Sequence, residues 1–177
     1  MMKRAFLSLT ITAIVLSACN SNAGDTAVST EKAEETGVPI PKQMGAVNDF
    51  EGIINDEDEI DLSTAIENFE ESTGNRIVVI TMDTIPSDED ATLFAAKIGN
   101  QWDVGDGSKN NGLIILMSEG VSQIGIATGQ GVEQVYNDSV CDNVIRSIIP
   151  HLSVGDYSGG MEKAVSLLGE VSHPSEK

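Results

Sequence analysis

The chain has 177 residues, of which 28 are acidic and 10 are basic, so its formal net charge at pH 7 is −18. This excess of negative charge repels nucleic acid and anionic lipid headgroups, so neither is an expected ligand, and it attracts cations instead. The two cysteines, Cys19 and Cys141, lie in such different contexts that no intramolecular disulfide framework is expected.

The first residues have the pattern of a secretion signal. Lys3 and Arg4 precede an apolar stretch, residues 5–15, that is too short to span a bilayer. Residues 1–18 are therefore predicted to be a signal peptide. Leu16-Ser17-Ala18-Cys19 resembles the lipobox of bacterial lipoproteins, which predicts that Cys19 is lipid-modified and anchors the mature chain in a membrane. The alternative is an ordinary secreted protein with a cysteine near its cleavage site.

The resemblance to a lipoprotein also predicts where in the cell the protein is located. Asn20 follows the cysteine, and the aspartate that retains many lipoproteins in the inner membrane is absent, which favours the outer membrane or the cell surface of the cell envelope. Residues 20–37 are small, polar and charged, so residues 19–37 are predicted to form the lipidated cysteine and a flexible tether. Residues 38–170 then form one folded domain, and residues 171–177 form a disordered tail.

The first half of the domain alternates helix and strand signals. Residues 38–41 are expected to be extended, and Asn55 can cap a helix in which Leu62, Ala65, Ile66 and Phe69 form an apolar stripe. Gly74 ends this helix. Residues 76–81 form a continuous β-branched run, which is typical of a strand covered on both faces. Residues 88–90 open a second helix.

The second half predicts a hairpin followed by two helices. Residues 113–117 form a buried strand that turns at residues 118–120 into a strand over residues 121–128. Helices are expected at about residues 137–151 and 157–168. This order predicts an α/β layered domain with a mixed sheet. Cys141 recurs with apolar residues at helical spacing, which indicates a buried small side chain.

Several landmarks together resemble the TPM domain family, named for thylakoid lumen, photosystem II repair and nematode proteins. The resemblance is carried, in order, by the motifs Val47-Asn48-Asp49-Phe50-Glu51-Gly52, Trp102-Asp103-Val104-Gly105, Lys109-Asn110-Asn111-Gly112, Gly129-Gln130-Gly131-Val132-Glu133 and Gly155-Asp156-Tyr157. It implies a three-layer α/β/α sandwich over a small mixed sheet. It also implies divalent-cation binding near acidic residues, and acid phosphatase activity as attributed to plant members. One position departs from the family, because Asn110 stands where an aspartate is usual.

Phosphatase chemistry has little support from the residues themselves. Cys141 and Arg146 have the wrong spacing for a cysteine phosphatase loop and share a predicted helix. Thr81-Met82-Asp83 holds one aspartate where the aspartyl phosphatase pattern needs two. His151 is expected at a helix C-terminus. Gly129-Gln130-Gly131 offers backbone amides to an anion but lacks the third glycine or lysine of a nucleotide loop.

A metal route remains open, because carboxylate, amide and carbonyl oxygens suit Ca²⁺ or Mg²⁺. Loops are expected to converge at the carboxyl ends of the strands. Each candidate ligand also has a structural alternative as a turn or helix cap. The candidates are Asp49, Asp83, Asp103, Asn110, Asn111, Glu133 and Asp138, with Asp106 beside them.

The sequence therefore predicts a membrane-tethered TPM-domain lipoprotein that binds Ca²⁺ or Mg²⁺. It is expected to be a monomeric domain that supports the assembly or maintenance of an envelope protein partner. A metal-dependent acid phosphatase and a purely structural envelope lipoprotein are the alternatives.

Overall fold

The computed structural model describes residues 37–172. The predicted signal peptide, Cys19 with its predicted lipid modification, and residues 20–36 of the predicted tether lie outside this range, as do residues 173–177. The described part contains eight elements in the order predicted from the sequence. They are β1 (Val47–Asp49), α1 (Asp56–Thr73), β2 (Arg76–Thr81), α2 (Ala91–Trp102), β3 (Gly112–Ser118), β4 (Gln123–Thr128), α3 (Asp138–Leu152) and α4 (Tyr157–Ser172).

The four strands form one mixed sheet with the spatial order β1-β2-β3-β4. The first three are parallel, and β4 runs antiparallel to β3 as the second arm of a hairpin. The side chains of β3 are all buried, as are those of β2 after Arg76. This is the continuous apolar pattern of strands covered on both faces, so the sequence interpretation of these runs is confirmed.

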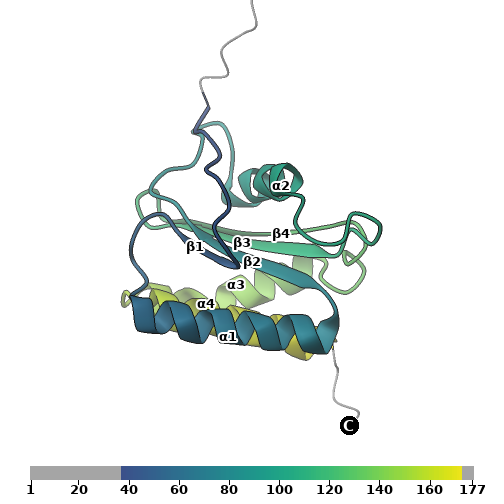
Figure 1. The fold of residues 1–177 in the computed structure, drawn as a ribbon. Helices are drawn as coiled ribbons and strands as arrows, with labels where there is room; N and C mark the ends of the chain where they lie inside the picture. Colours follow the sequence, from purple (N-terminus) through teal and green to yellow (C-terminus); the bar gives the residue numbers. More distant parts are fainter. Residues whose placement is uncertain (1–36, 173–177) are drawn as a thin grey trace, which may run out of the picture. The chain divides into compact units, whose positions relative to one another are not determined.

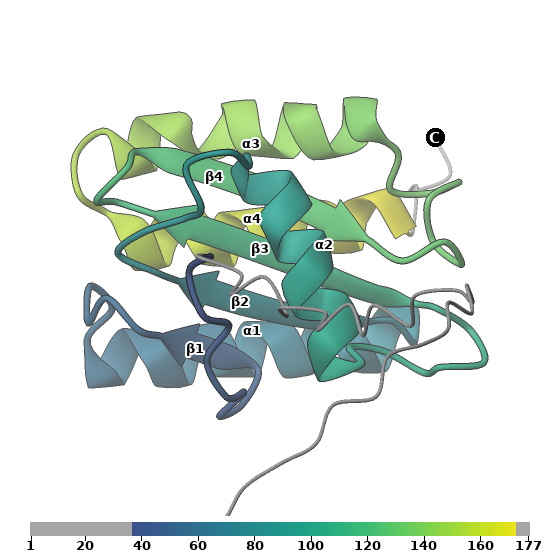
Figure 2. The same ribbon diagram turned by 90° about the horizontal axis from the view of Figure 1, so that it is seen from above.

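The helices cover the two faces of the sheet unequally (Figures 1 and 2). Helices α1, α3 and α4 lie on one face and bury the larger apolar cluster, which includes Leu62, Ile115 and Leu168. Helix α2 crosses the other face and buries a smaller cluster, to which the extended residues Val38 and Ile40 are added. The predicted three-layer α/β/α arrangement is therefore confirmed.

The helix signals of the sequence have the expected physical basis. The Asn55 side chain accepts hydrogen bonds from the backbone N–H groups of Glu57 and Asp58 and donates one to the Asp58 carboxylate. This satisfies the free donors at the start of α1, and Gly74 ends the helix in the left-handed conformation. The acidic run after Asn55 is thus a capped first turn, which suits the positive end of the helix dipole.

Three boundaries differ from the sequence prediction. The hairpin turn extends through Ser122, whose φ of 53° is left-handed, so β4 begins at Gln123 and not at residue 121. Asn137, and not Asp138, caps α3. Helix α4 continues to Ser172, beyond the predicted residue 168, because Val171 still packs against the larger cluster and Ser172 hydrogen-bonds the buried Tyr136 hydroxyl.

Candidate functional site

The predicted metal ligands lie at opposite edges of the sheet. Asp49 and Asp83 follow the carboxyl ends of β1 and β2. Asp103, Asn110, Asn111, Glu133 and Asp138 lie at the other edge, where β3 begins and β4 ends. A seven-residue strand such as β3 spans roughly 20 Å, which is far more than one ion can bridge. The expected convergence of all these loops at the carboxyl edge is therefore wrong, because the loops before β3 and after the antiparallel β4 meet at the amino edge.

At the carboxyl edge, Asp49 serves the turn that leads into α1. Its carboxylate accepts hydrogen bonds from the backbone N–H of Gly52 at 3.0 Å and of Ile54 at 2.8 Å, and from the Thr81 hydroxyl. Three donors on two oxygens leave little capacity for a cation. The alternative interpretation of Asp49 as a turn cap is thus confirmed.

Glu51 joins the same loop to the β3–β4 turn. Its carboxylate accepts hydrogen bonds from the backbone N–H groups of Glu119 and Gly120. Burial raises the pKa of Glu51, the two N–H groups oppose this rise, and the nearby charges of Glu119 and Asp83 add to it. Sequence reasoning gave Glu51 no role, because its partners lie 68 and 69 residues away.

At the amino edge, two loops pack backbone against backbone. The N–H of Gly129 donates to the Gly112 carbonyl at 2.8 Å, and that of Gly131 donates to the Asn110 carbonyl at 3.0 Å. A Cβ on Gly131 would lie 1.8 Å from the Lys109 carbonyl oxygen, so only glycine allows this approach. These N–H groups already donate hydrogen bonds within the protein, so the two glycines do not have the anion-binding role predicted for them.

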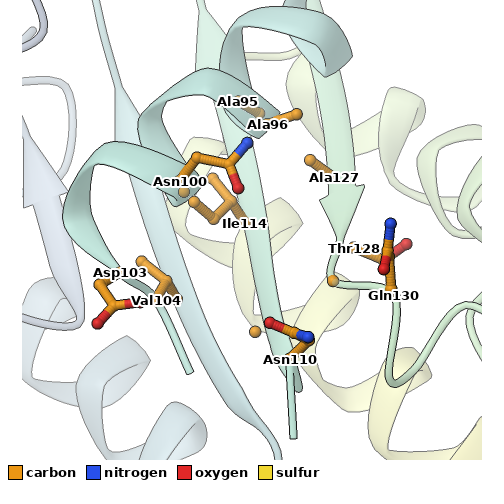
Figure 3. Close-up of a pocket in the computed structure, with 13 residues that line it drawn as sticks. Ala95, Ala96, Asn100, Asp103, Val104, Asn110, Ile114, Ala127, Thr128 and Gln130 are labelled. Atoms are coloured by element: carbon orange, nitrogen blue, oxygen red, sulfur yellow. The ribbon is translucent and has the colours of Figure 1, made fainter. Parts of the chain in front are cut away.

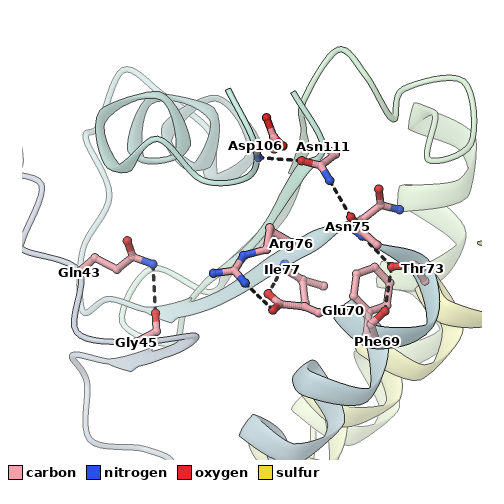
Figure 4. Close-up of polar contacts among 11 residues, drawn as sticks. Gln43, Gly45, Phe69, Glu70, Thr73, Asn75, Arg76, Ile77, Asp106 and Asn111 are labelled. Atoms are coloured by element: carbon pink, nitrogen blue, oxygen red, sulfur yellow. Dashed lines mark hydrogen bonds and ion pairs between the residues drawn. The ribbon is translucent and has the colours of Figure 1, made fainter. Parts of the chain in front are cut away.

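Asn111 holds this edge together from inside (Figure 4). It is buried, its Oδ1 accepts from the Asp106 N–H at 2.8 Å, and its Nδ2 donates to the Gly74 carbonyl at 2.7 Å. Its backbone carbonyl accepts from the Arg76 N–H at the start of β2. Asn111 is therefore a structural residue that joins three segments, and its amide oxygen and nitrogen both have partners within the protein.

Asp106 belongs to the turn of the same loop. Its carboxylate accepts from the hydroxyl and the backbone N–H of Ser108. These bonds, with a smaller contribution from Lys109, hold the pKa of Asp106 below its ordinary value. The turn interpretation of Asp106-Gly107 is confirmed.

A cleft of about 430 Å³ opens between α2 and the ends of β3 and β4 (Figure 3). Its floor is apolar, with Ala95, Ile114 and Ala127 among the residues that line it. Its polar lining residues are Asn100, Asp103, Asn110, Thr128 and Gln130. No basic residue lines it. It brings Asp103 and Asn110 of the predicted set to one place.

The side-chain oxygens that line the cleft limit which ions it can bind. Within residues 37–172 there is no cluster of three or more His, Cys, Asp or Glu side chains that could hold a metal ion. Asp103 is the one carboxylate among the lining residues, on the side of the cleft opposite Gln130 (Figure 3). Asn100, Asn110 and Gln130 carry side-chain amides, whereas Thr128 pairs with Leu113, so its hydroxyl is directed to the other face of the sheet. Such oxygens are acceptable to Ca²⁺, but without several carboxylates they give weak affinity.

Three polar lining residues were missed by the sequence analysis as candidate ligands. Asn100 is a residue of α2, whereas Asp103 is the left-handed C-cap of that helix, so no helical spacing marked Asn100. Thr128 and Gln130 are brought to the cleft only by the packing of β4 against β3.

Neither of the two nucleophile candidates belongs to the cleft. Cys141 is buried in α3, and burial together with Asp138 and Asp142 raises its pKa to about 11, so it is a neutral thiol at pH 7. The Nδ1 atom of His151 lies 2.7 Å from a carboxylate oxygen of Asp156 at the junction of α3 and α4. The interpretation of Cys141 as a small buried side chain is confirmed.

The sequence matches the TPM domain family over residues 47–171, which includes both edges and all eight elements save the last residue of α4. The chain belongs to the TPM domain family.

Solved structures of bacterial proteins share its fold. The solution structure of an N-terminal domain from P. gingivalis has a TM-score of 0.65 at 26% identity, covering 73% of this chain and 83% of that one. An N-terminal domain from Corynebacterium glutamicum has a TM-score of 0.60 at 19% identity, covering 80% and 90%. A protein of the psychrophilic bacterium Bizionia argentinensis has a TM-score of 0.60 at 20% identity, covering 68% and 82%. A comparison with curated proteins gives no significant match.

The family motifs of this TPM domain now have separate roles. The glycines of Gly129-Gln130-Gly131 permit the contact between the two loops, and Asn111 ties them to α1 and β2. Asn110 has a φ of 48°, a left-handed conformation that asparagine and aspartate both tolerate. The departure at residue 110 therefore changes the charge of the cleft while preserving a residue type that this backbone accepts.

We expect Gly131→Ala to lower the free energy of unfolding by more than about 1 kcal/mol, because the added Cβ forces the two loops apart. Urea denaturation measures this change. Gly107→Ala is the matched control in the same loop pair, because its Cβ would have its nearest neighbour at 4.0 Å. Equal stability of the two variants would contradict the close packing.

The raised pKa of Glu51 predicts a pH-dependent stability. Because the folded state holds this proton more tightly than the unfolded state, the stability of wild type relative to Glu51→Gln should fall as pH rises from the ordinary glutamate pKa through the raised value. Thermal unfolding of both proteins across that window measures it. If the stability of wild type relative to Glu51→Gln rose with pH instead, the hydrogen bonds from the two N–H groups would lower the pKa of Glu51 more than burial raises it.

Proposed function

We propose that this TPM domain binds a divalent cation, with Ca²⁺ favoured over Mg²⁺, in the cleft at the amino edge. The observation that supports this most directly is the composition of the lining, which has one carboxylate, Asp103, and three side-chain amides but no basic side chain. A cation entering the cleft meets a negative field from a chain of net charge −18.

The residues present fit a weakly held ion. Asp103 would supply the charged oxygen on one side of the cleft, and Asn110 or Gln130 would supply neutral oxygens on the other, with water completing the shell. Ca²⁺ accepts such irregular sets, whereas Mg²⁺ demands near-octahedral geometry. Extracellular calcium modules with few carboxylates have dissociation constants of about 0.1–1 mM, and we expect a value in that range.

We further propose that the domain works at a membrane surface of the cell envelope, held there through lipidated Cys19. Within residues 37–172 every helix is too short or too polar to cross a membrane. The chain reaches the folded part beside α2, where the Trp102 indole N–H donates to the Pro41 carbonyl at 2.9 Å. The cleft also borders α2, which favours a role on an envelope protein near the anchor.

Calcium titration tests the cleft. Amide resonances of residues 103, 110, 128 and 130 should shift on addition of Ca²⁺ to the intact chain. Asn110→Asp should tighten binding by about tenfold if its added charge contributes about 1.4 kcal/mol. Asp103→Asn should weaken binding by a similar factor because it removes the charged ligand.

Asp83→Asn is the matched control, because it removes the same charge at the opposite edge of the sheet. It should leave calcium affinity unchanged. Loss of binding in Asp83→Asn would move the site to the carboxyl edge. No shift at about 10 mM Ca²⁺, well above the expected range, would overturn cation binding and favour a purely structural lipoprotein.

The anchor is tested separately in the producing cell. Cys19→Ser should release the protein from the membrane fraction and remove the mass of the acyl chains, because the thiol is the site of attachment. Cys141→Ser replaces the buried cysteine of α3 and is the matched control, which should stay membrane-bound. Membrane association of Cys19→Ser equal to that of wild type would contradict the lipid anchor.

A further inference from the structure

Strand β4 is a free edge of the sheet, because its only strand neighbour is β3. The bond from the Gly129 N–H to the Gly112 carbonyl fixes the alternation of the antiparallel ladder. By this alternation the backbone groups of Ile124, Ile126 and Thr128 point away from β3. Within residues 37–172 no backbone hydrogen bond joins these three residues to another segment. We call these outward groups the β4 edge.

The β4 edge lacks three of the devices that protect natural sheet edges from strand pairing, although α3 lies beside it. Natural edges carry charged residues, proline or a bulge that prevents another strand from adding. The sequence Gln123–Thr128 contains no charge and no proline, and its six residues pair with β3 in unbroken register. In a protein with so many charged side chains, an uncharged edge of this length indicates a surface that pairs.

Helix α3 lies beside this edge and extends beyond it when the sheet is seen from above (Figure 2). Asp138, Asp142, Ile145 and Ile149 follow one another at spacings of four, three and four residues, so they form one stripe along the helix. We call this stripe the α3 ledge.

The opposite side of α3 is directed toward the neighbouring helix. Val140, Asn143 and Ser147 line a groove of about 340 Å³ against α4. The α3 ledge is therefore on the side away from α4, toward the outer edge of the sheet. Ile149 is 47% exposed there, although it is a large apolar residue.

The charges beside the edge select the occupant. Asp138 is exposed, and Asp142 has only a loose, exposed pair with Arg146 at 3.9 Å. Such a pair contributes little and is readily replaced. A basic segment would meet both carboxylates, whereas a second copy of this chain would bring another net charge of −18.

We propose that the β4 edge binds an extended basic peptide segment of another protein as an added strand. Its backbone pairs with the outward groups of Ile124, Ile126 and Thr128. On the side of the added strand that faces α3, apolar side chains rest on Ile145 and Ile149, and lysine or arginine side chains reach Asp138 and Asp142. Backbone pairing supplies affinity, and the ledge supplies selectivity. This inference is independent of cation binding and of the lipid anchor.

The test uses the intact chain and a ten-residue peptide in which every second residue is threonine and the residues between them, which share one face of a strand, are two lysines followed by three valines. Binding should slow hydrogen exchange of the amides of Ile124, Ile126 and Thr128, because these N–H groups become hydrogen-bonded. A peptide of the same composition with its lysines on one face of the strand and its valines on the other, and one N-methylated at alternate residues, should bind at least about tenfold more weakly. Equal binding of all three peptides, or shifts without exchange protection, would overturn strand addition.

Two variants locate the surface. Ile149→Lys places a positive charge on the α3 ledge, which repels the lysines of the peptide and should weaken binding by about tenfold. Val154→Lys adds the same charge at a residue that is 79% exposed beyond α3, and should leave binding unchanged. Equal effects of both variants would reduce the interaction to general charge attraction and overturn the assigned surface. Exchange protection that appears without peptide and increases with protein concentration would assign the edge to a second copy instead.

Discussion

The close backbone contact between the loop before β3 and the turn after β4 is the constraint on which the amino edge depends. Gly131 and Gly129 allow the turn to lie directly on the carbonyls of Lys109 and Asn110. This contact fixes where Asn110 and Gln130 stand beside α2, and so it forms the cleft. Asn111 then extends the constraint to the end of α1 and the start of β2 through its side-chain amide. Because the loops are held by backbone and not by side chains, the lining of the cleft can vary without loss of its shape.

The sequence predicted the architecture because the signals for it are local. The β-branched run at residues 76–81 and the apolar stripe from Leu62 to Phe69 depend only on period and burial, and both appear as expected. The boundaries failed where tertiary contacts decide them. Ser172 remains helical because it meets Tyr136, a residue 36 positions earlier. The left-handed conformation of Ser122 lengthens the hairpin turn, and no residue preference in the sequence predicts this conformation.

The candidate site was less predictable, since acidic residues have similar patterns whether they bind ions or close turns. Asp49 and Asn111 looked like ligands by residue type, yet their polar atoms are taken up by backbone partners, some of them more than 30 residues away. The direction of β4 determines where the remaining candidate ligands lie. An antiparallel last strand returns the chain to the amino edge, so the motif that follows it meets the loop before β3 and not the ends of β1 and β2. The turn at residues 118–120 predicts this return, whereas the rule that loops converge at the carboxyl ends holds for parallel strands and not for an antiparallel last strand.

The hydrogen bond between Trp102 and Pro41 has a practical and mechanical consequence. Trp102 is the only tryptophan in the chain, so its fluorescence reports, without any label, whether the segment at residues 38–41 stays docked on α2. Tension applied from the N-terminal side would load this contact before it reaches β1, whose parallel pairing with β2 resists it in shear. The tryptophan fluorescence of the protein would then change under load while the sheet is still intact. It would therefore report the force on the N-terminal segment without an added label.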